Sequence, residues 1–201
     1  MTRWEDSADI IFKNGIIFNP YTCEWLNEDF AVRNGIIIGT GPGYTGKEEV
    51  DLKSSYVCPG FIDAHVYIES SLLTPYEYAR LVMQHGTTTV VADPHEIANV
   101  CGIAGIEYML QAHGEQPLDI MVMLPSCVPA TPIDECAKTL TADLLRHFVN
   151  RDGVLGLGEM MNVPGVLSED PMVMEKLTLT SIRDGHAPFL TGPMLDQYIA
   201  T

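Results

Sequence analysis

The sequence predicts an α/β fold, in which a parallel sheet of repeated strand–helix units follows a small β-rich segment. Three observations predict it. Short apolar strand patterns fill residues 8–58, and from residue 59 onward apolar runs alternate with segments of helical spacing. The composition is that of a globular protein, with 46% hydrophobic and 19% charged residues among 201 positions. Repeated βα units are compatible with a doubly wound sheet and with a (β/α)8 barrel.

The N-terminal segment, residues 1–58, is predicted to form a small β-sandwich. Turn signals separate its short strands at two places, Lys13-Asn14 followed by Gly15, and Asn34-Gly35. Each turn signal predicts a β-hairpin. The expected strands are 8–12, 15–18, 30–33, 36–39, 49–52 and 55–57.

Residues 59–201 are predicted to hold four βα units and the start of a fifth. Gly86 and Gly114 follow helical spacing and predict helix ends. Residues 87–92 are β-branched and apolar, which is typical of a fully buried parallel strand. The expected strands are 61–66, 87–92, 119–124 and 154–160, with 183–188 as a short strand or its exit loop. The expected helices are 75–85, 103–113, 141–150, 171–178 and 194–201.

Charge and composition exclude several partners and compartments. The formal net charge of −16 argues against nucleic acid and anionic membrane, which select for Lys and Arg. No run approaches the ~20 apolar residues that cross a bilayer, and residues 1–9 lack the apolar centre of a secretory signal. The five scattered cysteines fit reduced thiols, so we expect a cytoplasmic protein. Cys127 is expected to be a small buried residue and not a nucleophile.

Polar side chains gather where the predicted strands end, which is where barrel enzymes hold their active sites. Asp63, His65, Tyr67 and Glu69 alternate along the first strand, so they are expected to share one face. The later strands end at Asp93, His95 and Glu96, at Ser126 and Cys127, at Glu159, and at Asp184 and His186.

His65, Glu159 and His186 come from three different strand ends, and such a set can converge on a divalent metal. A metal there would lower the pKa of a water molecule. A lone histidine at a strand end is more often a hydrogen-bonded structural group, so spacing alone leaves both interpretations open. Glu159 lies in an apolar strand and needs partners there. His85, His113 and His147, which lie in or beside predicted helices, are assigned structural roles.

Several motifs resemble known proteins. The sequence Pro59-Gly60-Phe61-Ile62-Asp63-Ala64-His65 resembles the first-strand motif of the amidohydrolase superfamily. Within that superfamily, the chain resembles the adenine deaminase family at residues 68–71 (IESS), 86–100 (GTTTVVADPHEIANV), 123–132 (MLPSCVPATP), 156–167 (GLGEMMNVPGVL) and 184–188 (DGHAP).

The resemblance implies a metal-dependent hydrolase barrel of the (β/α)8 type and a small β-sandwich built from both chain ends. It implies that adenine is the small-molecule substrate and that water converts it to hypoxanthine and ammonia. It also implies a divalent metal, manganese or iron first and zinc as a further option. His65, Glu159 and His186 correspond to metal ligands, with Glu159 also catalytic. We place His95, Glu96 and Ser126 near the substrate or behind the ligands.

The chain departs from the family pattern at two places. Tyr67 stands where the family has a second first-strand histidine, and a phenol with a pKa near ~10 is a poor substitute for imidazole. Residues 59–201 supply four or five of eight strands, so we expect an incomplete barrel and little activity from this chain alone. A non-catalytic remnant and a related cyclic amidohydrolase stay open as alternatives. The expected partner is a missing C-terminal chain or a second copy in a homo-oligomer.

Overall fold

The computed structural model describes residues 7–201, and the chain divides into two compact units with the boundary between Pro59 and Gly60. The expectation that residues 1–9 hold no secretory signal falls partly on residues 1–6, which lie outside the described residues.

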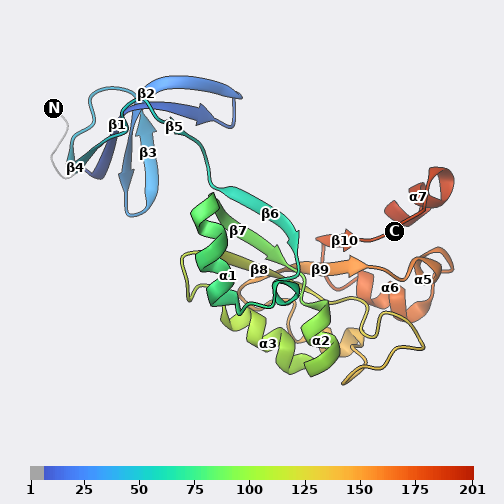
Figure 1. Ribbon diagram of the computed structural model, residues 1–201. Coiled ribbons are helices and arrows are strands. Elements are labelled where there is room, and N and C mark those ends of the chain that lie inside the picture. Colours follow the sequence, from blue (N-terminus) through green and yellow to red (C-terminus); the bar gives the residue numbers. More distant parts are fainter. Residues whose placement is uncertain (1–6) are drawn as a thin grey trace. The chain divides into compact units, whose positions relative to one another are not determined.

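The N-terminal unit is a five-stranded sheet with the order β3-β2-β1-β4, in which β5 also pairs with β1 (Figure 1). Strand β1 runs antiparallel to β2 and parallel to β4 and β5. Its small core is Ala8, Ile11 and Ala31. The described residues of this unit form one sheet, so the second layer of the expected sandwich stays a prediction. The strands are β1 (Ala8–Asn19), β2 (Glu24–Arg33), β3 (Ile36–Thr40), β4 (Gly46–Asp51) and β5 (Tyr56–Val57).

The hairpin predicted at Lys13-Asn14 is wrong, because β1 continues through these residues as one strand. The register with β2 shifts between Phe12 and Gly15, which marks a β-bulge. Asn14 takes a left-handed conformation (φ 57°), and its N–H donates to Oδ1 of Asp29 at 3.0 Å. The turn signal therefore bends the strand instead of reversing it, since β2 pairs with β1 on both sides of the bulge, while β4 pairs with β1 before it and β5 after it.

The second predicted hairpin is confirmed. Strands β2 and β3 are joined by Asn34 and Gly35, both with positive φ (52° and 76°). This is the backbone that a two-residue type I′ turn requires, and it explains the Asn-Gly pair.

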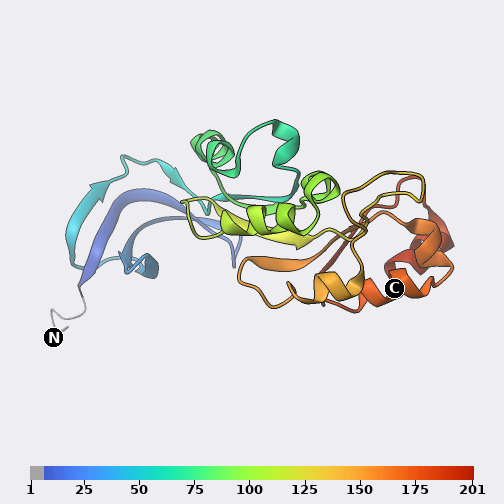
Figure 2. The same cartoon turned by 90° about the horizontal axis from the view of Figure 1, so that it is seen from below.

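The C-terminal unit is built on a five-stranded sheet in the order β10-β9-β8-β7-β6, with every neighbouring pair parallel. Helices α1, α2, α3 and α6 lie on one side of this sheet (Figures 1 and 2). The strands are β6 (Phe61–Val66), β7 (Thr87–Ala92), β8 (Asp119–Leu124), β9 (Val154–Met160) and β10 (Arg183–Gly185). The α-helices are α1 (Pro75–Val82), α2 (His95–Cys101), α3 (Ile103–Gln111), α4 (Ala142–Arg146), α5 (Val163–Leu167), α6 (Pro171–Leu177) and α7 (Gly192–Ile199), with 3-10 turns η2 (Glu69–Ser71) and η3 (Met83–His85).

One continuous hydrophobic core holds these strands and helices together. Its fully buried side chains include Ile106 and Met109 of α3 and Ile120 and Leu124 of β8. Each such side chain contributes roughly 1.5–3 kcal/mol by leaving water. Side-chain caps fix where the helices begin, as at Asp170, whose Oδ1 accepts from the N–H of Met172 at 2.8 Å.

The predicted α/β class is confirmed, as a curled parallel sheet with helices that forms an incomplete barrel. Among residues 7–201, no strand pairs with the outer edge of β6 or of β10. Phe61 and Ile62 of β6 are 60% and 67% exposed there. A closed barrel of this type needs eight strands. None of the helices within residues 7–201 is long and apolar enough to span a bilayer.

Several element predictions need correction. Helices α2 and α5 were not expected, because they are only seven and five residues long and directly follow strand-end residues. The helix predicted at 141–150 ends at Arg146. Residues 183–188, expected as a short strand or its exit loop, form strand β10 up to Gly185. Strand β7 is not fully buried, since Thr88 is exposed.

Candidate metal centre

The carboxyl ends of the parallel strands bring the three predicted ligand residues together. His186, just after β10, places Nδ1 2.8 Å from Oε2 of Glu159 in β9. His65 near the end of β6 places Nε2 3.6 Å from the same oxygen. Parallel strands end at one edge of a sheet, so side chains far apart in sequence meet there.

Two aspartates that were not predicted as ligands join this group. Oδ2 of Asp184 lies 2.8 Å from Nδ1 of His65. Ligand atoms of His65, Asp93 and Asp184 all lie within 4.8 Å of one another. Both aspartates stand at strand ends beside predicted site residues, and that position was the signal available in the sequence.

Tyr67 lies on the same side as His65 and directs its hydroxyl at Glu159. The hydroxyl donates a hydrogen bond to Oε1 of Glu159. The rings of Tyr67 and His65 meet edge to face with centroids 5.0 Å apart. Burial raises the pKa of Tyr67 far above its ordinary value, and the neighbouring Glu159 raises it further. Tyr67 therefore stays protonated and acts as a donor to the carboxylate.

Glu159 is buried, yet it is held as a carboxylate. Burial alone raises its pKa, but the hydrogen bonds from Tyr67 and His186 outweigh burial, so the pKa of Glu159 lies below its ordinary value. The two oxygens have different partners, Tyr67 on Oε1 and His186 on Oε2. Charge-assisted hydrogen bonds of this kind fix the orientation of a carboxylate.

A buried polar network supports β9 from behind. Oδ2 of Asp93 accepts from the N–H of Glu159 at 2.8 Å, and Oδ1 pairs with Nδ1 of His95. Nε2 of His95 accepts from the N–H of Cys127 at 3.2 Å, so the ring is neutral and carries its proton on Nδ1. The structure thus places both nitrogens of His95 in structural hydrogen bonds.

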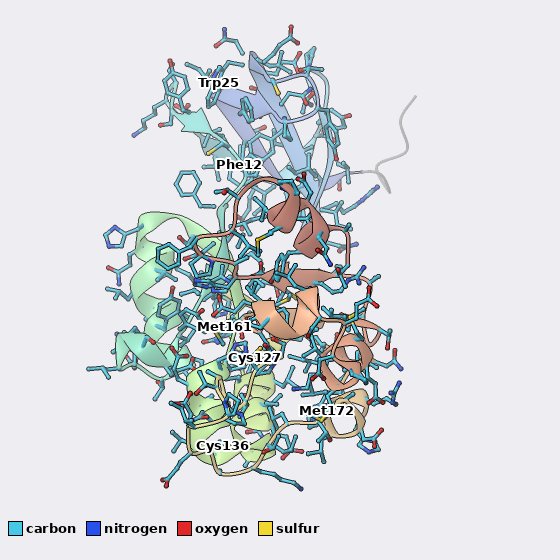
Figure 3. The ribbon with its side chains drawn as sticks, turned by 90° about the vertical axis from the view of Figure 1, so that its right-hand side faces the viewer. Phe12, Trp25, Cys127, Cys136, Met161 and Met172 are labelled. Atoms are coloured by element: carbon cyan, nitrogen blue, oxygen red, sulfur yellow. The ribbon has the colours of Figure 1, made fainter. Side chains whose placement is uncertain are left out.

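Ser126 also supports β9 and does not face the ligand group. Its hydroxyl donates to the carbonyl oxygen of Glu159 at 2.6 Å. Its neighbour Cys127 is buried, as expected, and its sulfur accepts from the N–H of Met161 at 3.3 Å. Both residues are labelled in Figure 3.

A pocket of about 510 Å³ opens beside this network. Glu96 lines it together with Tyr67, His95, Asn99 and Glu159. Glu69 does not share the face of His65, contrary to the expectation from alternation. The extended backbone of β6 ends at Val66, and Glu69 begins a 3-10 turn that redirects its side chain.

The chemistry of the donor set fits a divalent transition metal. Imidazole nitrogens and carboxylate oxygens gather within a few ångströms, and two of the carboxylates, Asp93 and Glu159, are buried. Such mixed sets suit zinc, iron and manganese. The Tyr67 hydroxyl, which occupies one oxygen of Glu159, departs from a set made of imidazole and carboxylate ligands.

Comparisons with known proteins show relatives that match nearly the whole chain. A chain named adenine deaminase from Methanoregula boonei is 58% identical over 197 residues, which are 98% of this chain and 35% of that protein. One of the same name from Methanoculleus marisnigri is 61% identical over 171 residues, covering 85% of this chain and 33% of its own. The chain thus spans about a third of the length of these relatives.

Solved structures share the fold at low identity. A D-hydantoinase from Bacillus sp. AR9 superimposes with a TM-score of 0.60 at 18% identity, over 89% of this chain and 40% of that one. A dihydroorotase gives a TM-score of 0.55 at 17% identity, over 95% and 55%. The sequence model of the amidohydrolase family matches residues 56–184. With well over half of its residues inside that match, the chain belongs to the amidohydrolase family.

Proposed function

We propose that this chain supplies the metal-binding part of an adenine deaminase active site, which converts adenine and water to hypoxanthine and ammonia. The observation that carries the proposal is the 58% identity to a protein named adenine deaminase over 98% of this chain. The site geometry supports it, because the residues that resemble the family's ligands lie together at the strand ends.

His65, Glu159 and His186 would hold the metal, with Asp93 and Asp184 beside them. Manganese or iron is the first choice and zinc the second. When bound, a divalent metal supplies Lewis-acid activation of water near neutral pH. The chain's own groups orient this site: Tyr67 and His186 fix Glu159, and Asp93 fixes the backbone of Glu159.

The pocket beside the ligands is the proposed adenine site. The reaction replaces the exocyclic amino group of adenine by oxygen from water, so a proton must reach the leaving ammonia. Glu159, ionised and adjacent to the pocket, is the proposed proton acceptor. Glu96 faces the same pocket, while His95 and Ser126 act from behind the strands.

About two thirds of each relative has no counterpart in this chain. The rest of the active site is proposed to come from a polypeptide equivalent to that part. The open edges of β6 and β10 are where further strands would pair. The partner would be a separate C-terminal chain or a second copy. The five unpaired cysteines support a cytoplasmic location.

The experiment is a hypoxanthine assay on the purified 201-residue chain with manganese or iron. We expect little or no turnover alone, and turnover when the C-terminal portion of the Methanoregula boonei protein is added. Glu159→Gln should abolish the restored turnover, whereas Glu175→Gln, an exposed control, should not.

Two results would change the proposal. No turnover in the mixture would favour a non-catalytic remnant, an alternative that Tyr67 at a ligand position also favours. Turnover of ~1 s⁻¹ or more by the chain alone would show that it builds a complete site without a partner.

A further inference from the structure

Two carboxyl side chains, Glu69 and Glu96, join the loop after β6 to the first turn of α2. Oε1 of Glu69 accepts from the N–H of Ile97 at 3.0 Å. In return, the hydroxyl of Ser70 donates to Oε1 of Glu96 at 3.1 Å. The two segments are therefore tied in both directions, next to the pocket that Glu96 lines.

The second oxygen of Glu69 has no conventional partner. Oε2 is buried, and none of the described residues donates a hydrogen bond to it. The side chain of Glu96 lies within hydrogen-bonding reach of Glu69. Two carboxylates at this distance repel each other when both are ionised, but they bond when one carries a proton.

The surroundings favour a neutral Glu69. Burial raises the pKa of Glu69 and the neighbouring Glu96 raises it further, against the lowering effect of the Ile97 N–H. The titratable groups that line the pocket with Glu96 include Tyr67, from the segment after β6, His95, from α2, and three further carboxyl groups, those of Asp134, Glu135 and Glu159. Tyr67 stays protonated and His95 is neutral, so neither supplies a positive charge.

We infer that Glu69 is a neutral carboxylic acid that donates its proton in a hydrogen bond to Glu96. The pair then presents the Glu96 carboxylate to the pocket, as an acceptor for N–H groups of a heterocyclic substrate. Glu96 then receives O–H donors from Glu69 and Ser70. Its exposed lone pairs face the pocket that Tyr67 and Glu159 also line. Glu69 is a positioning residue in this arrangement. The part that concerns the substrate rests on the proposed function, since adenine carries both a ring N–H and an amino group.

The shared proton is tested without substrate, by thermal unfolding of the chain from about pH 5 to about pH 9. A folded-state pKa above the unfolded one means that the native state binds the extra proton, so stability falls as pH rises between the two values. The wild type should show this fall. Glu69→Gln and Glu96→Gln should both flatten it, because an amide donates without titrating.

Glu107→Gln is the matched control, since Glu107 is an exposed helical glutamate that only approaches Arg151 at 3.9 Å. It should keep the wild-type pH dependence. If both pair variants keep the same slope as Glu107→Gln, the shared proton is refuted. Should one pair variant fail to fold, the other gives the answer alone.

The positioning role is tested in the mixture with the C-terminal portion of the relative. Glu69→Ala should raise KM for adenine about tenfold or more, and Glu69→Gln should retain the wild-type KM. Equal KM values for Glu69→Ala and wild type would overturn the positioning role. Absence of turnover in every mixture would refute the proposed function and the substrate part with it, whereas the pH experiment would still decide on the proton.

Discussion

The hydroxyl of Tyr67 donates a hydrogen bond to Oε1 of Glu159, a residue 92 positions further along the chain. His186 occupies the other oxygen of the same carboxylate at 2.8 Å. Where the family resemblance expects an imidazole that binds metal, this chain therefore has a proton donor that engages the ligand itself. The consequence for metal binding is open to a direct test.

Tyr67→His should raise the affinity for Mn²⁺, because it replaces a protonated phenol by an imidazole nitrogen at the end of β6. Removing a residue that hydrogen-bonds to a metal ligand typically lowers metal affinity about 10–100-fold. Adding a ligand should therefore raise the affinity by more than about tenfold. Titration calorimetry with Mn²⁺ measures the change. Tyr67→Phe is the control, since it removes the hydroxyl without adding a ligand. Equal affinities for the histidine variant and the wild type, both folded, would show that position 67 does not affect the centre.

Gly158→Ala should destabilise the chain by about 2–4 kcal/mol, from overpacking and a displaced hydrogen bond. A Cβ at Gly158 would lie 2.5 Å from Oδ2 of Asp93, which is fully buried. Asp93 would have to move and would lose the N–H of Glu159. Urea unfolding measures the free energy. A change below about 0.5 kcal/mol, the usual range for surface positions, would mean that Asp93 is not held tightly under β9.

The sequence predicts much of the C-terminal unit, because most of its parallel strands are continuous apolar runs. Glycine or polar residues mark where these runs begin and end. Strands β6 to β9 start and end at the predicted residues. Local signals fail where neighbouring strands decide the outcome. Asn14 carries a turn signal, but pairing with β2 and β4 makes it a bulge.

The candidate site shows the same division. Strand ends and family resemblance indicate His65, Glu159 and His186, and the structure brings them together. Sequence alone does not show that both nitrogens of His95 are used in structural hydrogen bonds, since the second partner, Cys127, lies 32 positions away in the chain. Nor does it show Asp184 against His65, a contact that depends on the order β10-β9-β8-β7-β6.

Lys176→Met should change the pH dependence of stability. Nζ of Lys176 donates to the carbonyl oxygen of Ser126 at 2.7 Å, and burial lowers the pKa of Lys176 below its ordinary value of 10.5. Between the two pKa values the unfolded chain binds more protons than the folded chain, so the contribution of Lys176 to stability rises with pH in that interval, up to about 10.5. The methionine variant lacks this contribution. The free energy of unfolding of the variant minus that of the wild type should therefore be greatest near neutral pH and decline toward higher pH.

Thermal unfolding at several pH values measures this, with the exposed Lys138→Met as control. The control removes the same charge without changing a buried group, so its pH profile should follow the wild type. Parallel profiles for Lys176→Met and Lys138→Met would contradict the assignment of Lys176 as a desolvated lysine.

The central claim is that Glu159, with His65 and His186, forms a divalent metal centre, and Mn²⁺ binding to the purified chain tests it most directly. The wild type should bind Mn²⁺ in equilibrium dialysis. Glu159→Gln should weaken binding by more than about tenfold, since it removes a buried carboxylate that both histidines approach. Glu175→Gln, an exposed change of the same kind, should leave the affinity as it is. If Glu159→Gln is folded and binds Mn²⁺ as tightly as the wild type and Glu175→Gln do, the strand-end cluster is not the metal centre.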